Sequence, residues 1–519
     1  MAANIIQHNQ DAHTSLSSGI NELTNIVKTT LGPRGRNVFI DRPSAGPLIT
    51  QNGRKITEML ELPDPFMNLG VKVLRDIAVQ TGDVTGKGTT TAVVLAQKMI
   101  ESGFKSIEVG VSSTDLKYGF TDVRKAVISE LKSQSNAINT SEEIKQIIDL
   151  ALNGDSEIAD LMVSAFEKVG RDGHVFIDSN DSRESELNIV GGMSFQEGVL
   201  NGDTNTLILK DTLILLTNEK IMDSSQIYSI LNSVSTANRD LLIISTETDS
   251  NFLSWIDRFN SRNPITVYIV EAPGFGNEQK AILQDIAIFT GGVVISKEVG
   301  LSLENATLDD LGVARKIFLS GSSTDIINGY GAQRDVLSRI SQIKRQLENA
   351  TSDDERLALQ KRLQNLSSGA AVISVGGGSK EIVSQRIDST RNALIAVHAA
   401  FSEGVVPGGG VTYIRVQKTL NQLRSHRPEL SSAIDVVNGA LEAPLRAIAE
   451  NADEDPDTVV KKVQGGSGSF GFNAQSRSYE DLVAAGIIDP AKVLRTAFEN
   501  ALHFSGLVLT TDSCITHQQ

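Results

Sequence analysis

The sequence predicts a mainly α-helical protein with an inserted α/β domain. In the first and last thirds of the 519-residue chain, apolar residues recur at helical spacing, as Leu16, Ile20 and Leu23 do. In the middle third, short apolar runs such as 241–244 and 265–270 alternate with helical stretches, which is typical of an α/β domain. The length fits about three domains of ordinary size. Since helical segments flank the α/β segment, we expect the first and last segments to fold together.

Helical spacing and turn residues define the outer elements. The first helix ends at Gly32-Pro33, because glycine permits a left-handed backbone and proline lacks an amide donor. The other expected elements there are a strand at 37–41 and helices at 67–79, at 92–100 and over most of 115–170. After residue 380 the chain is helical again, with a break at 408–410. The last long helix carries one stripe formed by Leu494, Ala497, Phe498, Ala501 and Ser505.

The middle third contains further expected elements. Helices at 252–259 and 280–289 separate the apolar runs, and another run lies at 293–295. From 333 to 366 the pattern is helical and charged, and Ser352-Asp353-Asp354 interrupts it. We therefore expect two helices there that form an antiparallel hairpin with a solvated face.

Composition excludes several classes of function. Lys and Arg number 48 against 63 Asp and Glu, so the formal net charge is −15, which disfavours nucleic acid and anionic membranes as partners. No apolar run approaches the roughly 20 residues that span a bilayer. One cysteine, Cys514, and seven scattered histidines offer no metal-ligand spacing. Residues 1–15 lack the pattern of a secretory signal, so we expect a cytoplasmic protein.

The segment 82–91, Gly-Asp-Val-Thr-Gly-Lys-Gly-Thr-Thr-Thr, carries the clearest chemistry. Its glycines allow close backbone approach to an anion, and the helix that follows offers N–H groups at its positive end. It is not a Walker loop, GxxxxGK[ST], because only three residues separate Gly82 from Gly86 and Gly88 replaces the Ser or Thr. Taken alone, the segment is equally compatible with a glycine-rich helix start that binds no ligand.

Several further motifs follow one another along the chain. They are TLGPRGRNV at 30–38, GKGTTT at 86–91, EAPGFG at 271–276, LQDIA at 283–287, TGG at 290–292, EGVVPGGG at 403–410, GFNA at 471–474 and IDP at 488–490. In this order and at this spacing they resemble the group I chaperonins, the GroEL type. The resemblance covers nearly the whole chain and is specific, because so many motifs agree at once.

The resemblance implies a GroEL-like three-domain chaperonin subunit. An equatorial nucleotide-binding and ring-contact domain would comprise 1–133 and 404–519, an intermediate hinge domain 134–189 and 371–403, and an apical polypeptide-binding domain 190–370. It also implies a homo-oligomeric ring, usually of seven subunits, single or double, whose cavity holds non-native polypeptides. Arg446 and Asp455 fall where the family makes contacts between rings, which leaves a double ring open.

ATP is the cofactor that the resemblance implies. The triphosphate would lie against Thr30, Leu31, Gly32 and Pro33 and against the helix start formed by Gly88, Thr89, Thr90 and Thr91. Gly409 would lie by the ribose, Asp489 on the ribose hydroxyls, and Asn473 and Ala474 by the adenine.

Three carboxylates that the family places at the nucleotide are absent. The Asp that binds magnesium is Lys87 here, a second Asp is Asn52, and the Asp that helps to activate the attacking water is Asn392. These changes raise the charge of the site by four units relative to the family pattern. Mg²⁺ prefers carboxylate oxygens and water, so a lysine should repel it, but the ammonium can pair directly with phosphate oxygens. An amide cannot accept a proton at neutral pH, so Asn392 cannot act as a base.

We therefore expect nucleotide binding that is weak or independent of Mg²⁺, with very slow hydrolysis or none. Base catalysis and electrostatic stabilisation typically contribute about 10²–10⁴ each to the rate. The alternative is that nearby acids substitute. Asp83 lies in the same loop, and Asp388 lies one turn before Asn392 on the same helix face.

For the apical domain, the resemblance implies a groove of apolar side chains that binds non-native chains. The candidates are Val199 in a loop, Tyr228 and Leu231 on one helix, and Phe252, Leu253, Trp255, Ile256 and Phe259 on the next. Helical spacing alone cannot separate groove residues from core residues. Polar residues replace apolar family residues at Asp203, Thr204, Asp257 and Arg258, so the use of a co-chaperonin lid stays open.

Two functions are compatible with the sequence. The first is a chaperonin ring that binds non-native polypeptides and moves with ATP, with weakened hydrolysis. The second is an ATPase-deficient holdase or scaffold ring that retains only the chaperonin architecture. Turnover with and without Mg²⁺, together with suppression of aggregation of a denatured client, separates the two.

Overall fold

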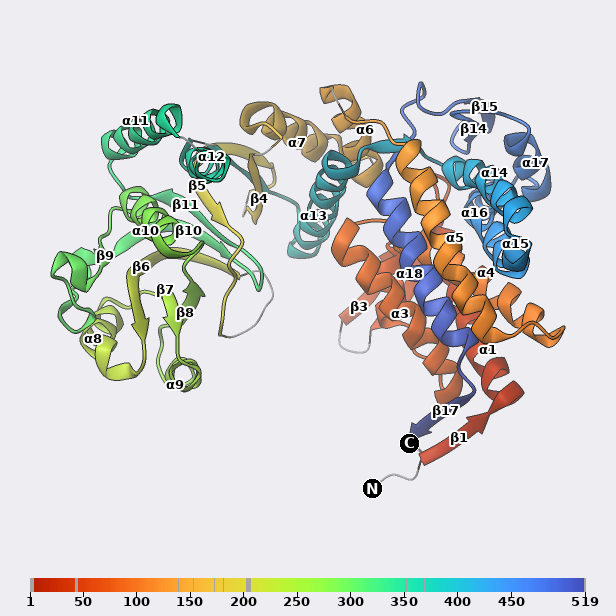
Figure 1. Ribbon diagram of the computed structural model, residues 1–519, viewed down its shortest axis with the longest axis horizontal. Coiled ribbons are helices and arrows are strands. Elements are labelled where there is room, and N and C mark those ends of the chain that lie inside the picture. The colour runs from red at the N-terminus through yellow and green to blue at the C-terminus, as the bar shows by residue number, and fades with distance from the viewer. Residues whose placement is uncertain are drawn as a thin grey trace. The chain divides into compact units, whose positions relative to one another are not determined.

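The computed structural model describes residues 4–42, 45–138, 140–152, 154–171, 173–180, 182–201, 207–350, 352–367 and 369–517. The chain forms two compact units (Figure 1). The first combines residues 1–163 with 379–519, and the second comprises 164–378. The second unit is thus inserted into the first, which confirms the predicted fold class of a mainly α protein with an inserted α/β domain. The boundaries of three domains stay a prediction.

The first unit is built mainly from helices. Several of its helices begin at capped positions: Asp64, for example, accepts hydrogen bonds from the amides of Phe66 and Met67 at the start of α3. The helices are α1 (Asn9–Val27), α2 (Gly53–Met59), α3 (Pro65–Thr85), α4 (Thr89–Glu108), α5 (Ser113–Ser133), α6 (Ser141–Leu152), α13 (Lys380–Glu403), α14 (Val411–His426), α15 (Ser431–Leu441), α16 (Ala443–Asn451), α17 (Pro456–Gln464) and α18 (Ala491–Leu509). A further helix, α7 (Ser156–Val169), begins in the first unit and ends in the second.

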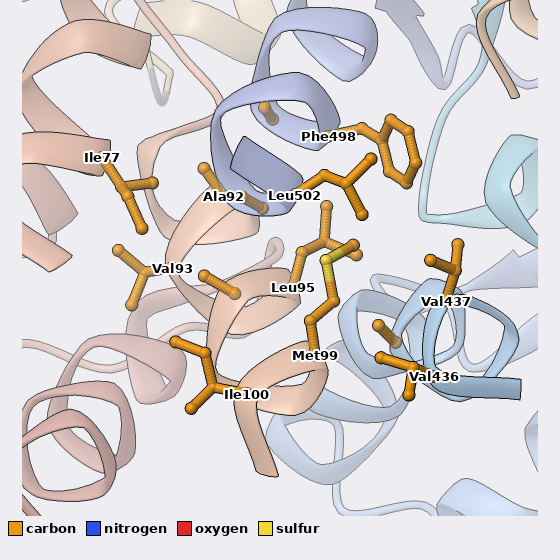
Figure 2. Packing of buried hydrophobic residues seen from close by; sticks show 14 of the residues in the cluster. Ile77, Ala92, Val93, Leu95, Met99, Ile100, Val436, Val437, Phe498 and Leu502 are labelled. Carbon is orange, nitrogen blue, oxygen red and sulfur yellow. The ribbon is translucent and has the colours of Figure 1, made fainter. Parts of the chain in front are cut away.

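The core of the first unit joins the two ends of the chain. Figure 2 shows side chains of α3, α4, α15 and α18 in contact, among them Ile77, Leu95, Val437 and Phe498. The stripe predicted on the last helix is buried throughout. Each fully buried large aliphatic or Phe side chain contributes about 1.5–3 kcal/mol. The prediction that the first and last segments fold together is therefore confirmed.

Short antiparallel pairs of strands complete the first unit within the described residues. They are β1 (Asn4–His8) with β17 (Ser513–His517), β2 (Val38–Arg42) with β3 (Ala45–Thr50), β13 (Val405–Pro407) with β16 (Ile488–Pro490), and β14 (Phe470–Asn473) with β15 (Ser478–Asp481). The pair β1 and β17 brings the two ends of the chain side by side (Figure 1). The sequence predicted the strand at 37–41 but not this terminal pair.

The second unit is a mixed sheet with helices on both faces. Its order is β4-β12-β5-β11-β10-β6-β7-β8, with β9 also paired to β6. The strands are β4 (His174–Ser179), β5 (Glu186–Phe195), β6 (Leu207–Ile221), β7 (Leu241–Thr248), β8 (Val267–Glu271), β9 (Val294–Ile295), β10 (Gly312–Leu319), β11 (Thr324–Gly329) and β12 (Gly369–Val375). The apolar run 241–244 is buried on both faces, as parallel pairing with β6 and β8 requires.

The helices of this unit follow the predicted alternation. They are α8 (Tyr228–Ala237), α9 (Ser250–Asn260), α10 (Gly276–Thr290), α11 (Gln333–Asn349) and α12 (Asp353–Ser367). One hydrophobic cluster joins α10, α11 and α12 to one face of the sheet, and another joins α8 and α9 to the opposite face. Two helices are present as predicted, but of the predicted break at 352–354 only Ser352 lies outside them, because α12 begins at Asp353.

Candidate nucleotide site and polypeptide-binding surface

The loop between α3 and α4 ends one helix and begins the next within three residues. Gly86 at φ 65° caps α3, and Gly88 at φ 78° is the N-cap of α4. Glycine adopts this left-handed region without the steric cost of a Cβ. The side chain of Thr85 fixes the loop, since its Oγ1 donates to the carbonyl oxygen of Lys87 at 2.7 Å. Because Gly88 has no capping side chain, the first amides of α4 can serve an anion.

Lys87 extends from this loop to α6. Its Nζ donates to the carbonyl oxygen of Leu150 at 2.5 Å. Burial lowers the pKa of Lys87 to about 8, and the negative charge of Asp489 opposes this shift. Burial also raises the pKa of Asp489, which the charge of Lys87 opposes. The two side chains therefore lie close enough to influence each other's protonation.

Asn52 lies beside the same loop and caps α2. Its Oδ1 accepts hydrogen bonds from the amides of Arg54 at 3.0 Å and Lys55 at 3.3 Å. The following residue, Gly53, approaches α4 so closely that a Cβ would lie 2.2 Å from Oγ1 of Thr90. Asn and Asp cap helices equally well, so the local backbone tolerates the change from the family carboxylate.

Asn392 lies on α13 and contacts the loop through its backbone. A Cβ on Gly86 would lie 2.5 Å from the carbonyl oxygen of Asn392. This close approach places Asn392 against the glycine loop between α3 and α4. Its side chain is an amide, which offers no base there.

The two acids that could substitute are engaged in ion pairs. Oδ1 of Asp83 accepts from Nη1 of Arg54 at 2.6 Å. Oδ2 of Asp388 accepts from Nζ of Lys55 at 2.8 Å. Both pairs are partly exposed. Each of these acids therefore faces a cation of α2 that competes with any metal ion for its oxygens.

The turn at residues 30–33 is held by Asn451 at the end of α16. The Nδ2 group of Asn451 donates to the carbonyl oxygens of Lys28 and Leu31, both at 2.8 Å. Thr30 is buried, and Gly32 has φ 84°, which places the turn in a conformation that favours glycine. Sequence reasoning did not identify Asn451, because it lies far from the turn in sequence and in none of the motifs.

Arg34 ties this turn to the predicted adenine side. Its guanidinium donates to the carbonyl oxygens of Ala474 and Gln475, both at 2.8 Å. The side chain of Asn473 is engaged locally: Nδ2 donates to Glu480 at 2.7 Å, and Oδ1 accepts from the amide of Gln475 at 3.0 Å. A base placed here would therefore meet backbone groups and an Asn amide that already has partners.

The predicted ribose residues lie together at the pair β13 and β16. Asp489 of β16 pairs in register with Val406 of β13. A Cβ on Gly408 would lie 3.2 Å from Oδ2 of Asp489, and one on Gly409 would lie 3.7 Å from the carbonyl oxygen of Phe472. Gly409 has φ 63°. The residues predicted from separate parts of the sequence thus occupy one neighbourhood of the first unit.

Within the described ranges, no group of three or more His, Cys, Asp or Glu side chains is arranged to hold a metal ion. No helix in the described part of the chain has the length and apolar character needed to cross a bilayer.

The residues predicted for polypeptide binding divide into two groups in the second unit. Val199, Leu231, Phe252 and Ile256 are buried in its core. Tyr228 is 61% exposed, whereas Leu253, Trp255 and Phe259 are partly buried at the edge of a core cluster. The rings of Trp255 and Phe259 stack with centroids 5.5 Å apart. Asp257 and Arg258 are exposed on α9, while Asp203 and Thr204 lie outside the described residues.

Comparison with known proteins agrees with the resemblance. The model of the TCP-1/cpn60 chaperonin family matches residues 23–250 and 266–519. Two crystal forms of the chaperonin gp146 from the bacteriophage EL 2 (Pseudomonas aeruginosa), solved in the presence of ATP-BeFx, have a similar fold. One is 17% identical with a TM-score of 0.69 and covers 99% of this chain and 100% of its own. The other is 18% identical with a TM-score of 0.65 and covers 99% of each chain.

Proposed function

The chain belongs to the TCP-1/cpn60 chaperonin family, and on this premise we propose that it works as a cytoplasmic chaperonin ring. The ring captures non-native polypeptides and changes conformation when adenine nucleotide binds, while hydrolysis is strongly slowed. The observation that carries this proposal is the site on the first unit. The glycine turns and the uncapped start of α4 are present, but Asn52, Lys87 and Asn392 occupy the positions of three family carboxylates.

Nucleotide binding is supported by the donors that surround the loop. The amides at the start of α4 and the ammonium of Lys87 are donors that suit a phosphate chain. The related gp146 was crystallised with the ATP analogue ATP-BeFx. ATP therefore fits the residues present, with its phosphates against α4 and its base beside Ala474.

Magnesium does not fit these residues. Lys87 repels a divalent ion, and the oxygen of Asn52 is used as a helix cap. Asp83 and Asp388 are paired to Arg54 and Lys55. Asp489 is the one carboxylate among the predicted nucleotide residues. We therefore propose that the charge of Lys87 replaces that of the metal ion, and that no residue acts as a strong base toward water.

Ring assembly is supported by exposed strand edges in the first unit. Isolated two-stranded sheets are marginal in water, and their unpaired edges favour pairing with other strands. The pairs β1–β17 and β2–β3 also expose apolar side chains, Ile6 (49%), Ile515 (59%), Phe39 (70%) and Ile49 (47%). We propose that these ribbons pair between neighbouring subunits, in rings of seven as is usual in the family.

Contacts between two rings have weaker support. Nη1 of Arg446 donates to Asp457 at 2.8 Å. Asp455 caps α17 by accepting from the amide of Thr458 at 2.9 Å. Both residues that match the family's ring-to-ring positions make hydrogen bonds within the subunit, and the proposal covers a single or a double ring.

Polypeptide capture is assigned to the exposed side of α8 and α9. Tyr228, Leu253, Trp255 and Phe259 form this surface, since the other candidates are in the core. The exposed charges of Asp257 and Arg258 make it more polar than the family's groove, so we expect weak binding of a co-chaperonin lid.

Phosphate release and client aggregation test this function together. Purified protein is incubated with ATP, with and without Mg²⁺, and separately with a chemically denatured client. We expect very slow release that Mg²⁺ does not accelerate, and suppression of aggregation that ATP changes. Suppression that ATP leaves unchanged would favour a holdase or scaffold ring. Rapid release that is lost in Asp388→Ala would show that this acid substitutes for the missing carboxylates.

A further inference from the structure

The last turn of α6 has no basic residue of its own. The final carbonyl groups of a helix have no amide partner within the helix, and this end carries partial negative charge. Asp149 in the same turn adds a carboxylate, whose pKa burial raises. The missing cation comes from Lys87, 63 residues away in sequence, which donates to the carbonyl oxygen of Leu150 at 2.5 Å. Lys87 is therefore the C-terminal cap of α6.

The phosphate loop is fastened to two helices at once. Gly86 packs against the backbone of Asn392 on α13, and the next residue, Lys87, reaches α6. Helices α6 and α13 pack directly on each other. The loop thus holds this helix pair through one backbone contact and one charged side chain.

The same ammonium stands beside the site proposed for the phosphates. Lys87 immediately precedes Gly88, the N-cap of α4, so its side chain starts next to the first amides of that helix. A hydrogen bond to an anionic phosphate oxygen is about twice as strong as one to a neutral carbonyl oxygen. A phosphate chain also repels the negative end of α6 and Asp149. The two arrangements of the ammonium therefore compete.

We propose that Lys87 is a latch that holds α6 when the site is empty, and that nucleotide phosphates release α6 by taking over its ammonium. This inference rests on the proposed nucleotide function of the site and adds the route by which occupancy reaches the α6–α13 pair. Loss of the cap leaves the last carbonyls of α6 to water, so its final turn opens more often. We expect amide exchange there to rise about tenfold, since a charged cap is worth roughly 1 kcal/mol or slightly more.

Hydrogen exchange of residues 148–152 in the full-length protein tests the latch. The probe is ADP in the presence of EDTA, at a concentration that calorimetry on the same samples shows to be saturating. In the wild type, ADP should accelerate exchange about tenfold. In Lys87→Met, exchange should already be fast without ADP and should not change when ADP is added. Lys72→Met, which removes an exposed lysine of α3, should behave like the wild type.

The outcomes separate this inference from the proposed function. Binding of ADP without any change in wild-type exchange would overturn the latch and leave nucleotide binding intact, and this comparison needs no variant. Equal exchange of the empty wild type and Lys87→Met would also overturn it. Failure of ADP to bind would overturn the nucleotide function and, with it, release by phosphates.

Discussion

The proposed nucleotide site of the first unit and the α8–α9 surface of the second unit are built in different ways. In the first unit, residues from the loops at 30–33, 86–91, 408–410 and 473–474 lie together. In the second, four of eight predicted residues are in the core. The first set depends on where glycines and helix starts place the backbone, whereas the second depends on which side of a helix faces a sheet.

This difference has a physical origin. A glycine at positive φ and a helix N-terminus fix the position of backbone donors whatever surrounds them. The apolar side of a helix packs inward by default, so an apolar residue on α9 is first of all a core residue. Phe252 and Ile256 follow that rule, while Trp255 and Phe259 lie at the margin of the same cluster.

The largest effect is expected when the three carboxylates of the family are restored in the proposed nucleotide site. The triple variant Asn52→Asp, Lys87→Asp and Asn392→Asp recreates a metal ligand set and a base. We expect Mg²⁺-dependent phosphate release to increase by about 10²-fold or more over the wild type. Steady-state release at saturating ATP measures this gain, and Asn232→Asp on the exposed side of α8 controls for an added carboxylate. No gain in a variant that still binds ATP would refute the assigned roles.

The division of the α8–α9 residues into core and surface can be tested by substituting one residue of each kind. Phe252→Ala should lower the free energy of unfolding of the second unit by about 3–5 kcal/mol, because Phe252 is 1% exposed. Tyr228→Ala should change it by less than about 0.5 kcal/mol, since this side chain is largely exposed. Urea unfolding monitors both variants.

Capture of a client polypeptide should depend on the exposed Tyr228, whose substitution hardly affects stability. Tyr228→Ala should reduce suppression of client aggregation although its fold is intact. If the double variant Tyr228→Ala, Trp255→Ser still suppressed aggregation fully, the α8–α9 surface would not be the polypeptide-binding surface.

The charge of Lys87 predicts that the affinity for ADP depends on pH. Burial lowers the pKa of Lys87 to about 8, so the ammonium is charged at neutral pH and loses its proton as the pH rises. Affinity for ADP in EDTA should therefore fall about tenfold between roughly pH 8 and pH 9.5. Bound phosphate stabilises the charged form and raises the pKa of Lys87, so the fall begins near the pKa of the empty site and its total size is set by the rise in pKa on binding. Lys87→Arg should retain the affinity across the range, and Lys87→Met should bind weakly at every pH. A fall of the same size in Lys87→Met would assign the titration to another group.

The smallest expected effect concerns Asn52. Asn52→Ala removes the side chain that accepts from the amides of Arg54 and Lys55 and should cost about 1 kcal/mol in unfolding free energy. Asn52→Asp should cost nothing measurable, because a carboxylate caps equally well. Thermal unfolding distinguishes the two, and equal losses would show that the cap is not what Asn52 supplies.

Much of the fold followed from periodicity, but several strands did not. The run at 241–244 is buried throughout and the run at 265–270 at four of its six positions, so both were visible as apolar strands. β10 and β11 carry polar residues such as Lys316 and Asp325, whose partners Asp178 and Ser194 come from other strands. The pair β1–β17 joins residues more than 500 positions apart and has no local signal. Such pairings depend on the folded neighbour and not on the segment itself.

In the proposed nucleotide site, the sequence predicted the glycine turns and the absence of three acids, but not the contacts that hold the turns in place. Asn451, Arg34 and the bond from Lys87 to Leu150 are long-range contacts to backbone oxygens. Any suitably placed carbonyl can serve as such an acceptor, so residue type alone leaves no signal of the partner.

The measurement that tests the central claim most directly is the affinity for ADP by calorimetry in Mg²⁺ and in EDTA. If the Lys87 ammonium takes the place of the metal ion, the two dissociation constants should agree within about threefold. Binding that tightens by about a hundredfold or more with Mg²⁺ would show that a divalent ion is coordinated beside the phosphates and would contradict the account.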